Sequence, residues 1–206
     1  MNIEVKNSIK PVDYLKSMKL LEERVEDVFL KKKSEFLWLL EHETVFTKGI
    51  RGKDNELLNK NINIIKTNRG GKYTLHSPGQ KVIYFVLNLK NRKKDIRKLI
   101  MDIERCIIEV LKEFNIKSQA DPKNIGIWVK EKNKLKKIAA IGVRVKKWVA
   151  YHGFSININN DLSLYNSIIP CGIKNKGITS MRKLGVSNYS NVENIIINKF
   201  LDTFLT

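Results

Sequence analysis

The sequence predicts a single α/β domain in which helices flank a mixed sheet. Long amphipathic runs with helical spacing alternate with short apolar runs of strand length. Some of these short runs follow one another like hairpins, which favours a mixed sheet over regular βαβ alternation. The chain has 206 residues, the length of one domain, and neither an internal repeat nor a long linker divides it.

The N-terminal half is expected to hold one helix and three strands. Residues 11–30 have apolar side chains near helical spacing, and the lysines at 31–33 suit a helix C-terminus. The apolar positions of that helix are Tyr14, Leu15, Met18, Leu21 and Val25. Strands are predicted over residues 35–40, 61–67 and 81–89.

The C-terminal half opens with the clearest helix, over residues 94–115. Its apolar stripe consists of Ile96, Leu99, Ile100, Ile103, Ile107, Val110 and Leu111. Strands are then predicted over 125–129, 137–145 and 148–159, with a turn at 133–136 and a last helix over 192–204. In the third of these strands Phe154, Ile156 and Ile158 alternate with polar residues, as in a strand with one apolar face.

The charge balance is strongly basic and raises the possibility of a nucleic-acid partner. Lys and Arg number 39 against 21 Asp and Glu, for a net charge of +18. However, 31 of these cations are Lys and only 8 are Arg, and Ile (26) and Asn (21) are also abundant. This composition is typical of A/T-rich coding drift, whereas phosphate recognition usually uses more Arg.

The two cysteines and the N-terminus indicate a cytoplasmic protein without a membrane anchor. Cys106 and Cys171 cannot build a disulfide framework and have no metal-ligand spacing. The N-terminus lacks the apolar region of a secretory signal, and no run approaches the ~18 apolar residues of a membrane span. Cys106 lies on the apolar stripe of the second helix, so we expect it in the core.

Cys171 is the first candidate for chemistry. Pro170 restricts the backbone before it and Gly172 permits unusual conformations after it, which would suit a thiol presented at a loop tip. A buried structural cysteine is the commoner alternative. A nucleophilic thiol also needs a group that favours its thiolate.

Four side chains could assist that thiol: the histidines His42, His76 and His152, and Lys137. A lysine at the start of an apolar strand face is partly desolvated, which lowers its pKa. Periodicity alone favours a plainer interpretation, in which Lys137 ends a Lys-rich turn and extends to water.

The stretch from Arg69 to Gln80 holds three glycines and a proline but matches neither common phosphate-loop motif. Gly70 and Gly71 would let the backbone pass close to a ligand. A pocket-lining loop and a plain turn remain equally good interpretations of this segment. No HExxH, paired-carboxylate or GxSxG motif is present.

Together these segments resemble the octanoyltransferases of lipoate biosynthesis. Four blocks match in order: Glu41-His42-x-x-Val45-Phe46-Thr47-x-Gly49; Arg69-Gly70-Gly71-x-x-Thr74-x-His76-x-Pro78-Gly79-Gln80; Lys137-Ile138-Ala139-Ala140-Ile141-Gly142-Val143-Arg144 continuing to His152-Gly153-Phe154; and Pro170-Cys171-Gly172-Ile173. They span most of the chain. The family commonly has an aromatic residue in place of Leu75 and a glycine in place of Ser77, so the loop shape can differ here.

The resemblance implies the mixed α/β fold of lipoate- and biotin-protein ligases. It implies octanoyl transfer from octanoyl-acyl-carrier protein to a lysine of a lipoyl domain, with no cofactor and no metal. By carry-over, Cys171 forms the thioester and Lys137 lowers the pKa of the thiol and moves protons. The implied substrate-binding residues are Arg69, Gly70, Gly71, Lys72, Tyr73, Thr74, Leu75, His76, Ala140, Ile141, Gly142, Gly153, Phe154 and Ser155.

The implied partners are octanoyl-acyl-carrier protein, the lipoyl domains of 2-oxoacid dehydrogenase E2 subunits, and the glycine cleavage H protein. We expect a monomer that contacts neither nucleic acid nor membrane. Since carrier proteins and lipoyl domains are typically acidic, part of the positive charge would speed encounter with them. Two alternatives are an ATP-dependent lipoate ligase, against which the block around Cys171 argues, and a basic nucleic-acid-binding module, against which the scattered lysines argue.

Overall fold

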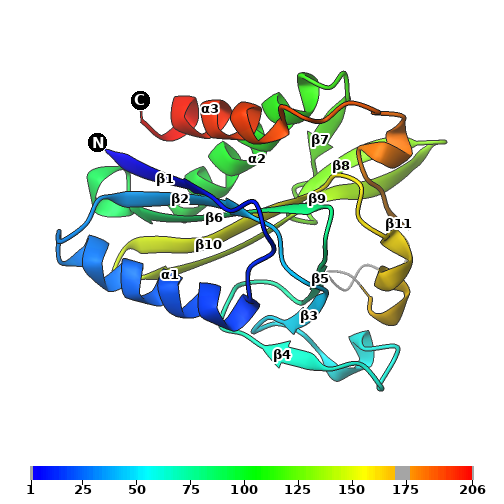
Figure 1. Cartoon of the computed structure of the whole chain (residues 1–206), viewed down its shortest axis with the longest axis horizontal. Coiled ribbons are helices and arrows are strands. Elements are labelled where there is room, and N and C mark those ends of the chain that lie inside the picture. Colours follow the sequence, from blue (N-terminus) through cyan, green and yellow to red (C-terminus); the bar gives the residue numbers. More distant parts are fainter. Residues whose placement is uncertain (1, 170–176, 206) are drawn as a thin grey trace.

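A large mixed sheet forms the centre of the computed structural model, which describes residues 2–169 and 177–205. The strand order is β1-β2-β6-β10-β9-β8-β7, and β11 pairs with β9 beside this path (Figure 1). The strands are β1 Ile3–Asn7, β2 Glu35–Leu40, β6 Gln80–Asn88, β7 Ser118–Ala120, β8 Ile127–Glu131, β9 Lys134–Lys146, β10 Val149–Asn157 and β11 Gly177–Ile178. β1–β2 and β9–β11 are parallel and the other pairs antiparallel, which confirms the mixed sheet.

A second, three-stranded sheet lies beside the large one, in the order β4-β3-β5. Its strands are β3 Val45–Lys48, β4 Ile64–Lys66 and β5 Tyr73–His76. Its own apolar cluster is built on Phe46, Tyr73, Leu75, Tyr165 and Ile168. β5 leads directly into β6, so this small sheet is joined to the centre of the large one (Figure 1).

Helices cover both faces of the large sheet (Figure 1). α1 (Tyr14–Phe29) packs on one face through Leu21, Val25 and Val28, while α2 (Ile96–Lys112) and α3 (Val192–Phe204) lie together on the other. Short 3₁₀ turns occur at η1 Asp54–Glu56, η2 Leu89–Asn91, η3 Leu162–Ser167 and η5 Arg182–Leu184. Burial on both faces explains why β2, β6 and β10 are buried along their whole length.

The three predicted helices are confirmed, with later starts for the first two. Asp13 caps α1 by accepting a hydrogen bond from the Lys16 amide at 2.8 Å, and Asp95 caps α2 through the Lys98 amide at 3.0 Å. Leu15 and Ile96, both assigned to apolar stripes, are instead 59% and 46% exposed. Each lies in the first turn of its helix.

The predicted strands are also present, but the expected turn at 133–136 is misplaced. The hairpin reverses at Lys132 and Asn133, whose φ values of 46° and 62° are left-handed, so β9 already begins at Lys134. The strand expected over 61–67 shortens to β4, since only its last part pairs with β3. Strands β1, β3, β5, β7 and β11 were not predicted.

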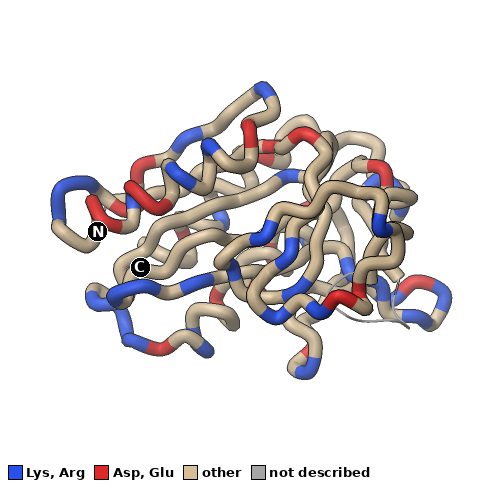
Figure 2. Tube along the Cα trace, turned by 90° about the horizontal axis from the view of Figure 1, so that it is seen from below, with Lys and Arg blue, Asp and Glu red and all other residues tan. Residues whose placement is uncertain are grey.

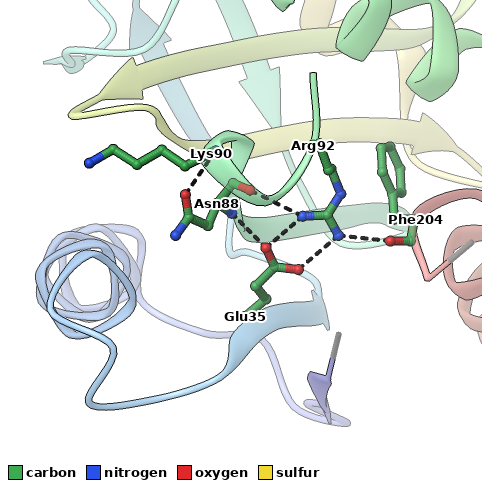
Figure 3. Close-up of polar contacts among 5 residues, drawn as sticks. All are labelled: Glu35, Asn88, Lys90, Arg92 and Phe204. Carbon is green, nitrogen blue, oxygen red and sulfur yellow. Dashed lines mark hydrogen bonds and ion pairs between the residues drawn. The ribbon is translucent and has the colours of Figure 1, made fainter. Parts of the chain in front are cut away.

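A buried ion pair between Glu35 and Arg92 lies at the start of β2 and the end of β6 (Figure 3). Glu35 on β2 binds Arg92 through both carboxylate oxygens, at 2.6 and 2.8 Å, and accepts the Asn88 amide at 2.7 Å. Arg92 also donates to the Phe204 carbonyl at 2.7 Å. These contacts tie β2, β6 and the end of α3 together, so removing one partner should be costly for stability.

The basic residues do not concentrate on one element. Figure 2 shows Lys and Arg along the whole trace, with Asp and Glu among them. Several cations are paired, as in the contacts of Lys146 and Lys147 with Glu26 at 2.7 and 3.0 Å. Within the described residues, no helix has both the length and the apolar character needed to cross a bilayer.

Candidate functional site

A pocket lies where the loop at 69–72 and β5 meet the middle of β9 and β10. Twelve of the predicted substrate-binding residues line it: Arg69, Gly71, Lys72, Tyr73, Thr74, His76, Ala140, Ile141, Gly142, Gly153, Phe154 and Ser155. Leu75 does not, because it is fully buried in the core of the small sheet. Gly70 is part of the loop but does not line the pocket, and a Cβ there would be 2.7 Å from the Val143 carbonyl.

Glycines allow the backbone segments of this pocket to approach one another. Gly142 and Gly153 are register partners on β9 and β10. A Cβ on Gly153 would stand 1.9 Å from the Ile83 carbonyl, so no side chain fits between β10 and β6. A Cβ on Gly142 would be 3.3 Å from the Gly70 carbonyl, which shows how closely the loop lies on β9.

Arg69 shapes the loop through its guanidinium. Nη2 donates to the carbonyls of Thr47 and Lys72 at 3.1 and 2.8 Å and to the Thr47 hydroxyl at 2.8 Å, while Nη1 donates to Gly70 at 3.0 Å. The side chain is 8% exposed. The guanidinium therefore joins the loop backbone at Gly70 and Lys72 to Thr47 on β3.

Burial lowers the pKa of all three histidines, to about 3 for His76 and for His152. His152 Nε2 lies 2.8 Å from Asn68 Oδ1. His42 Nδ1 donates to the Val12 carbonyl at 2.6 Å, so its Nε2 accepts from the Tyr84 hydroxyl at 2.8 Å. All three rings are neutral at physiological pH, and none of them supplies a cation to the pocket.

Four pocket-lining residues were not among the predicted site residues: Tyr14, Val82, Tyr84 and His152. Only His152 had a sequence signal, because it was one of the three histidines considered as partners of the thiol and belonged to a quoted block. Tyr14 lies on the apolar stripe of α1, and Val82 and Tyr84 lie in a continuous apolar run, so all three have the pattern of core residues. Among the described residues, no cluster of His, Cys, Asp or Glu could hold a metal ion.

Lys137 is buried, which corrects the interpretation that it extends to water. The residue is 3% exposed, and Nζ donates to the Ile125 carbonyl at 2.9 Å and lies 4.8 Å from the centre of the Trp128 ring. Strand β11 lies beside β9 at this point, since Ile178 is the parallel register partner of Lys137 and the Thr179 amide donates to the Lys137 carbonyl at 2.9 Å. The amine is therefore enclosed by β8, β9 and the segment before β8.

Cys171 lies outside the described residues. On the near side, the Ile169 amide donates to the Glu56 carbonyl at 2.7 Å, and on the far side Gly177 is paired with Lys136. Cys106 is buried between α2 and the core as predicted, and burial raises the pKa of its thiol to about 12. This thiol cannot serve as a nucleophile at neutral pH.

Comparison with sequence families gives one clear match. The model of the lipoyl protein ligase A/B catalytic domain matches residues 13–205. An octanoyltransferase of Wolbachia pipientis subsp. Culex pipiens is 45% identical over 194 residues, 93% of this chain and 95% of the relative. An octanoyltransferase of Ehrlichia chaffeensis is 44% identical over 205 residues, 98% and 96% of the two chains.

Solved structures with a similar fold include lipoate protein ligases. A bi-partite lipoate protein ligase from Thermoplasma acidophilum aligns with a TM-score of 0.73 at 14% identity, over 98% of this chain and 84% of that one. A lipoate-protein ligase A bound with ATP aligns with a TM-score of 0.72 at 14% identity, over 97% and 85%. At this identity the likeness establishes the fold, which agrees with the predicted fold class.

Proposed function

The chain belongs to the lipoyl protein ligase A/B catalytic domain family, and two relatives that match it over nearly their whole length are octanoyltransferases. We propose that this acyltransferase moves octanoyl from octanoyl-acyl-carrier protein to a lysine of a lipoyl domain. Cys171 carries the octanoyl group as a thioester between the two half-reactions. The observation that carries the residue assignment is the burial of Lys137. The Lys137 amine is enclosed by β8, β9 and the segment before β8, so it is suited to proton transfer rather than to solvent contact.

The first half-reaction exchanges one thioester for another. The Cys171 sulfur attacks the octanoyl carbonyl, and its proton passes to Lys137 Nζ, or the thiolate is already formed beside the Lys137 ammonium. The tetrahedral intermediate collapses with release of the carrier thiol, which takes up a proton from Lys137. Backbone N–H groups near Gly142 or Gly172 are candidates to stabilise the oxyanion.

The second half-reaction exchanges the thioester for an amide. The ε-amine of the lipoyl-domain lysine attacks the octanoyl carbonyl, the carbon–sulfur bond breaks, and the amine proton returns to the Cys171 sulfur by way of Lys137. The acyl group is activated throughout as a thioester, so the transfer needs no nucleotide.

The pocket supplies the binding site for the acyl chain. Its apolar lining includes Val82, Ile141 and Phe154, and its glycines leave room beside them. At ~0.8 kcal/mol per buried CH₂ group, an eight-carbon chain gains several kcal/mol of binding free energy there. The proposed acceptors are the lipoyl domains of 2-oxoacid dehydrogenase E2 subunits and the glycine cleavage H protein, and the enzyme works as a cytoplasmic monomer.

Intact mass spectrometry tests this function directly. The full-length protein is incubated with octanoyl-acyl-carrier protein without ATP, and an octanoyl adduct that hydroxylamine removes is expected. Cys171→Ser should lose the adduct, whereas Cys106→Ser should retain it, since Cys106 is buried with a raised pKa. A wild-type protein without an adduct, or an unchanged adduct on Cys171→Ser, would exclude the mechanism.

A further inference from the structure

A line of buried polar side chains joins the pocket wall to the strand beside Lys137. It consists of His76 at the end of β5, Gln80 at the start of β6, Asn157 at the end of β10, and Thr179 just after β11. All four are at most 7% exposed. His76 Nδ1 lies 2.6 Å from Gln80 Oε1, Gln80 Nε2 lies 2.9 Å from Asn157 Oδ1, and Asn157 Nδ2 lies 3.0 Å from the Thr179 carbonyl.

The Thr179 carbonyl fixes the direction of every hydrogen bond in this line. A carbonyl only accepts, so Asn157 must present its NH₂ to Thr179 and its oxygen to Gln80. Gln80 then donates through its NH₂ and presents Oε1 to His76. A carboxamide oxygen also only accepts, so His76 must carry its proton on Nδ1. In the neutral ring, Nε2 of this pocket-lining residue is therefore the acceptor nitrogen.

Thr179 in turn holds the backbone at Lys137. Its amide donates to the Lys137 carbonyl at 2.9 Å, its carbonyl accepts from Asn157, and its hydroxyl donates to Glu131 at 3.1 Å. Thr179 is fully buried and makes all three of these hydrogen bonds, so it fixes the position of β11 relative to β9. Lys137 is thus fixed from the β11 side through Thr179 and from the β8 side through Trp128, its register partner.

We propose that Gln80 and Asn157 are positioning residues for acyl transfer: their paired amides set the place of Lys137 through Thr179 and the tautomer of His76 at the pocket wall. This inference rests on the proposed function. Neither side chain lines the pocket, so each acts through another residue. A buried amide that loses its hydrogen-bond partner is costly, so the line selects one arrangement.

Two isosteric variants interrupt the line without changing its volume. Asn157→Asp removes the donor to Thr179, and Gln80→Glu removes the donor to Asn157. For each variant we expect kcat for octanoyl transfer to fall at least about tenfold, the equivalent of ~1.4 kcal/mol in the barrier, while KM for the octanoyl donor stays within about twofold. A lower kcat with an almost unchanged KM would indicate that Lys137 is misplaced, whereas damage to the pocket would also raise KM.

The tautomer of His76 gives a second measurement that a merely structural role would not change. Nitrogen-15 NMR of histidine-labelled protein should show Nδ1 of His76 protonated in the wild type and in Asn157→Asp. In Gln80→Met the acceptor for that proton is gone, and the proton should move in part to Nε2. A His76 that carries its proton on Nε2 in the wild type would overturn the deduced direction of the line.

Glu35→Gln provides the matched control at the opposite end of the same strands. Gln80 and Asn157 form the last pair of β6 and β10 at the pocket end, and Asn88 and Val149 form the last pair at the other end. Glu35 on β2 is buried and accepts a hydrogen bond from the Asn88 amide there (Figure 3). This variant should lower thermal stability and leave kcat unchanged. Unchanged kcat in both isosteric variants, or an equal loss in Glu35→Gln, would overturn the proposal.

Tyr165→Phe keeps the test decisive if an isosteric variant does not fold. The Tyr165 hydroxyl accepts the second Gln80 N–H at 2.9 Å. Its removal deletes one hydrogen bond to Gln80 and leaves the bond to Asn157, so kcat should fall only about threefold. A folded Tyr165→Phe with wild-type kcat would then count against the proposal. Failure of the proposed function itself appears differently, as a wild-type protein that forms no octanoyl adduct.

Discussion

Gly126 lies directly against the amine of Lys137. A Cβ at Gly126 would be 3.1 Å from Lys137 Nζ, 3.0 Å from its Cε and 2.7 Å from the Ala139 carbonyl. The residue has a φ of 127°, which side chains rarely adopt. Because Nζ donates to the neighbouring Ile125 carbonyl, the bend at Gly126 both makes space for the amine and supplies its acceptor.

Gly126→Ala should therefore slow acyl transfer by more than its loss of folding stability would explain. The new methyl group displaces Nζ from the Ile125 carbonyl, so we expect the rate of acyl-enzyme formation to fall at least about tenfold in single-turnover assays. Gly185→Ala is the control, because Gly185 also has a positive φ of 92° but nothing within 4 Å of its Cβ position. It should lose ~1 kcal/mol of stability and no activity. Equal rates in the two variants would exclude a role for Gly126 in placing Lys137.

Lys137→Met should retain the fold and lose the proton carrier. The methionine chain replaces the lysine stem beside Trp128, so packing is largely kept. Acyl-enzyme formation should slow by about 10²–10⁴-fold, the usual contribution of a positioned acid–base group. Lys134→Met on the same strand, at an exposed position, should keep its rate. Near-normal turnover in Lys137→Met would remove Lys137 from the mechanism.

Two glycines of the pocket floor should respond to alanine in opposite ways. At Gly153 the methyl group would meet the Ile83 carbonyl at 1.9 Å, so β10 and β6 cannot both stay in place and the protein should unfold at a much lower temperature. At Gly142 the nearest atom is 3.3 Å away, so the fold should tolerate the methyl group while the pocket narrows. Gly142→Ala should raise KM for the octanoyl donor more than for a butanoyl donor. An equal rise for both chain lengths would place Gly142 away from the acyl chain.

The elements that the sequence predicts well are those with a repeating apolar pattern. The helix over 192–204 and the strand over 35–40 have the predicted bounds, because a single buried face or a continuous buried run defines each. The unpredicted strands are short or polar. β7 is Ser-Gln-Ala and β11 is Gly-Ile, and both form only because a neighbouring strand offers hydrogen bonds.

For the site, the sequence predicted which residues are involved better than it predicted how they are buried. Asn157 was placed correctly on the polar side of an alternating strand, but it is 4% exposed and its amide is hydrogen-bonded to Gln80 and to the Thr179 carbonyl. Lys137 looked like part of a charged turn, since the two-residue reversal at 132–133 could not be located from composition. The family resemblance pointed to Lys137 by its motif, whereas only the three-dimensional structure shows that Ile125, Gly126 and Trp128 enclose its amine.

Stability should fall as the pH drops below 6.5 because His76 and His152 are buried as neutral rings. Each folded-state pKa is about 3, against 6.5 for an ordinary histidine, so the unfolded chain binds more protons between these values. Stability is complete above pH 6.5 and is lost progressively toward pH 3. At pH 5 each ring should cost about 2 kcal/mol, measured by urea unfolding at pH 7.5 and 5. His152→Asn should show a smaller decrease between the two pH values, and an identical decrease would mean that His152 is accessible to protons.

The basic residues beside the pocket loop should contribute more to the encounter with an acidic carrier than those elsewhere. The Arg51 amide donates to the Gly71 carbonyl at 3.0 Å, and Lys66 ends β4 opposite Lys48. Neither cation has an ion-pair partner among the residues that the structure describes. Reversing both to Glu should lower kcat/KM for octanoyl-acyl-carrier protein about tenfold at low salt, and less as salt screens the charges.

The matched control reverses Lys93 and Lys94, which follow η2 at the opposite end of β6 and are also exposed. Both double variants change the net charge by the same amount, so a difference between them reports position alone. A small octanoyl thioester without a carrier domain should react equally with both, because it lacks the acidic surface. If both double variants lose the same activity toward the carrier, or if kcat/KM does not depend on salt, the excess of lysine reflects composition and not a docking surface. A loss confined to Arg51 and Lys66 would instead place the carrier over the small sheet, at the entrance formed by the loop that Arg69 holds.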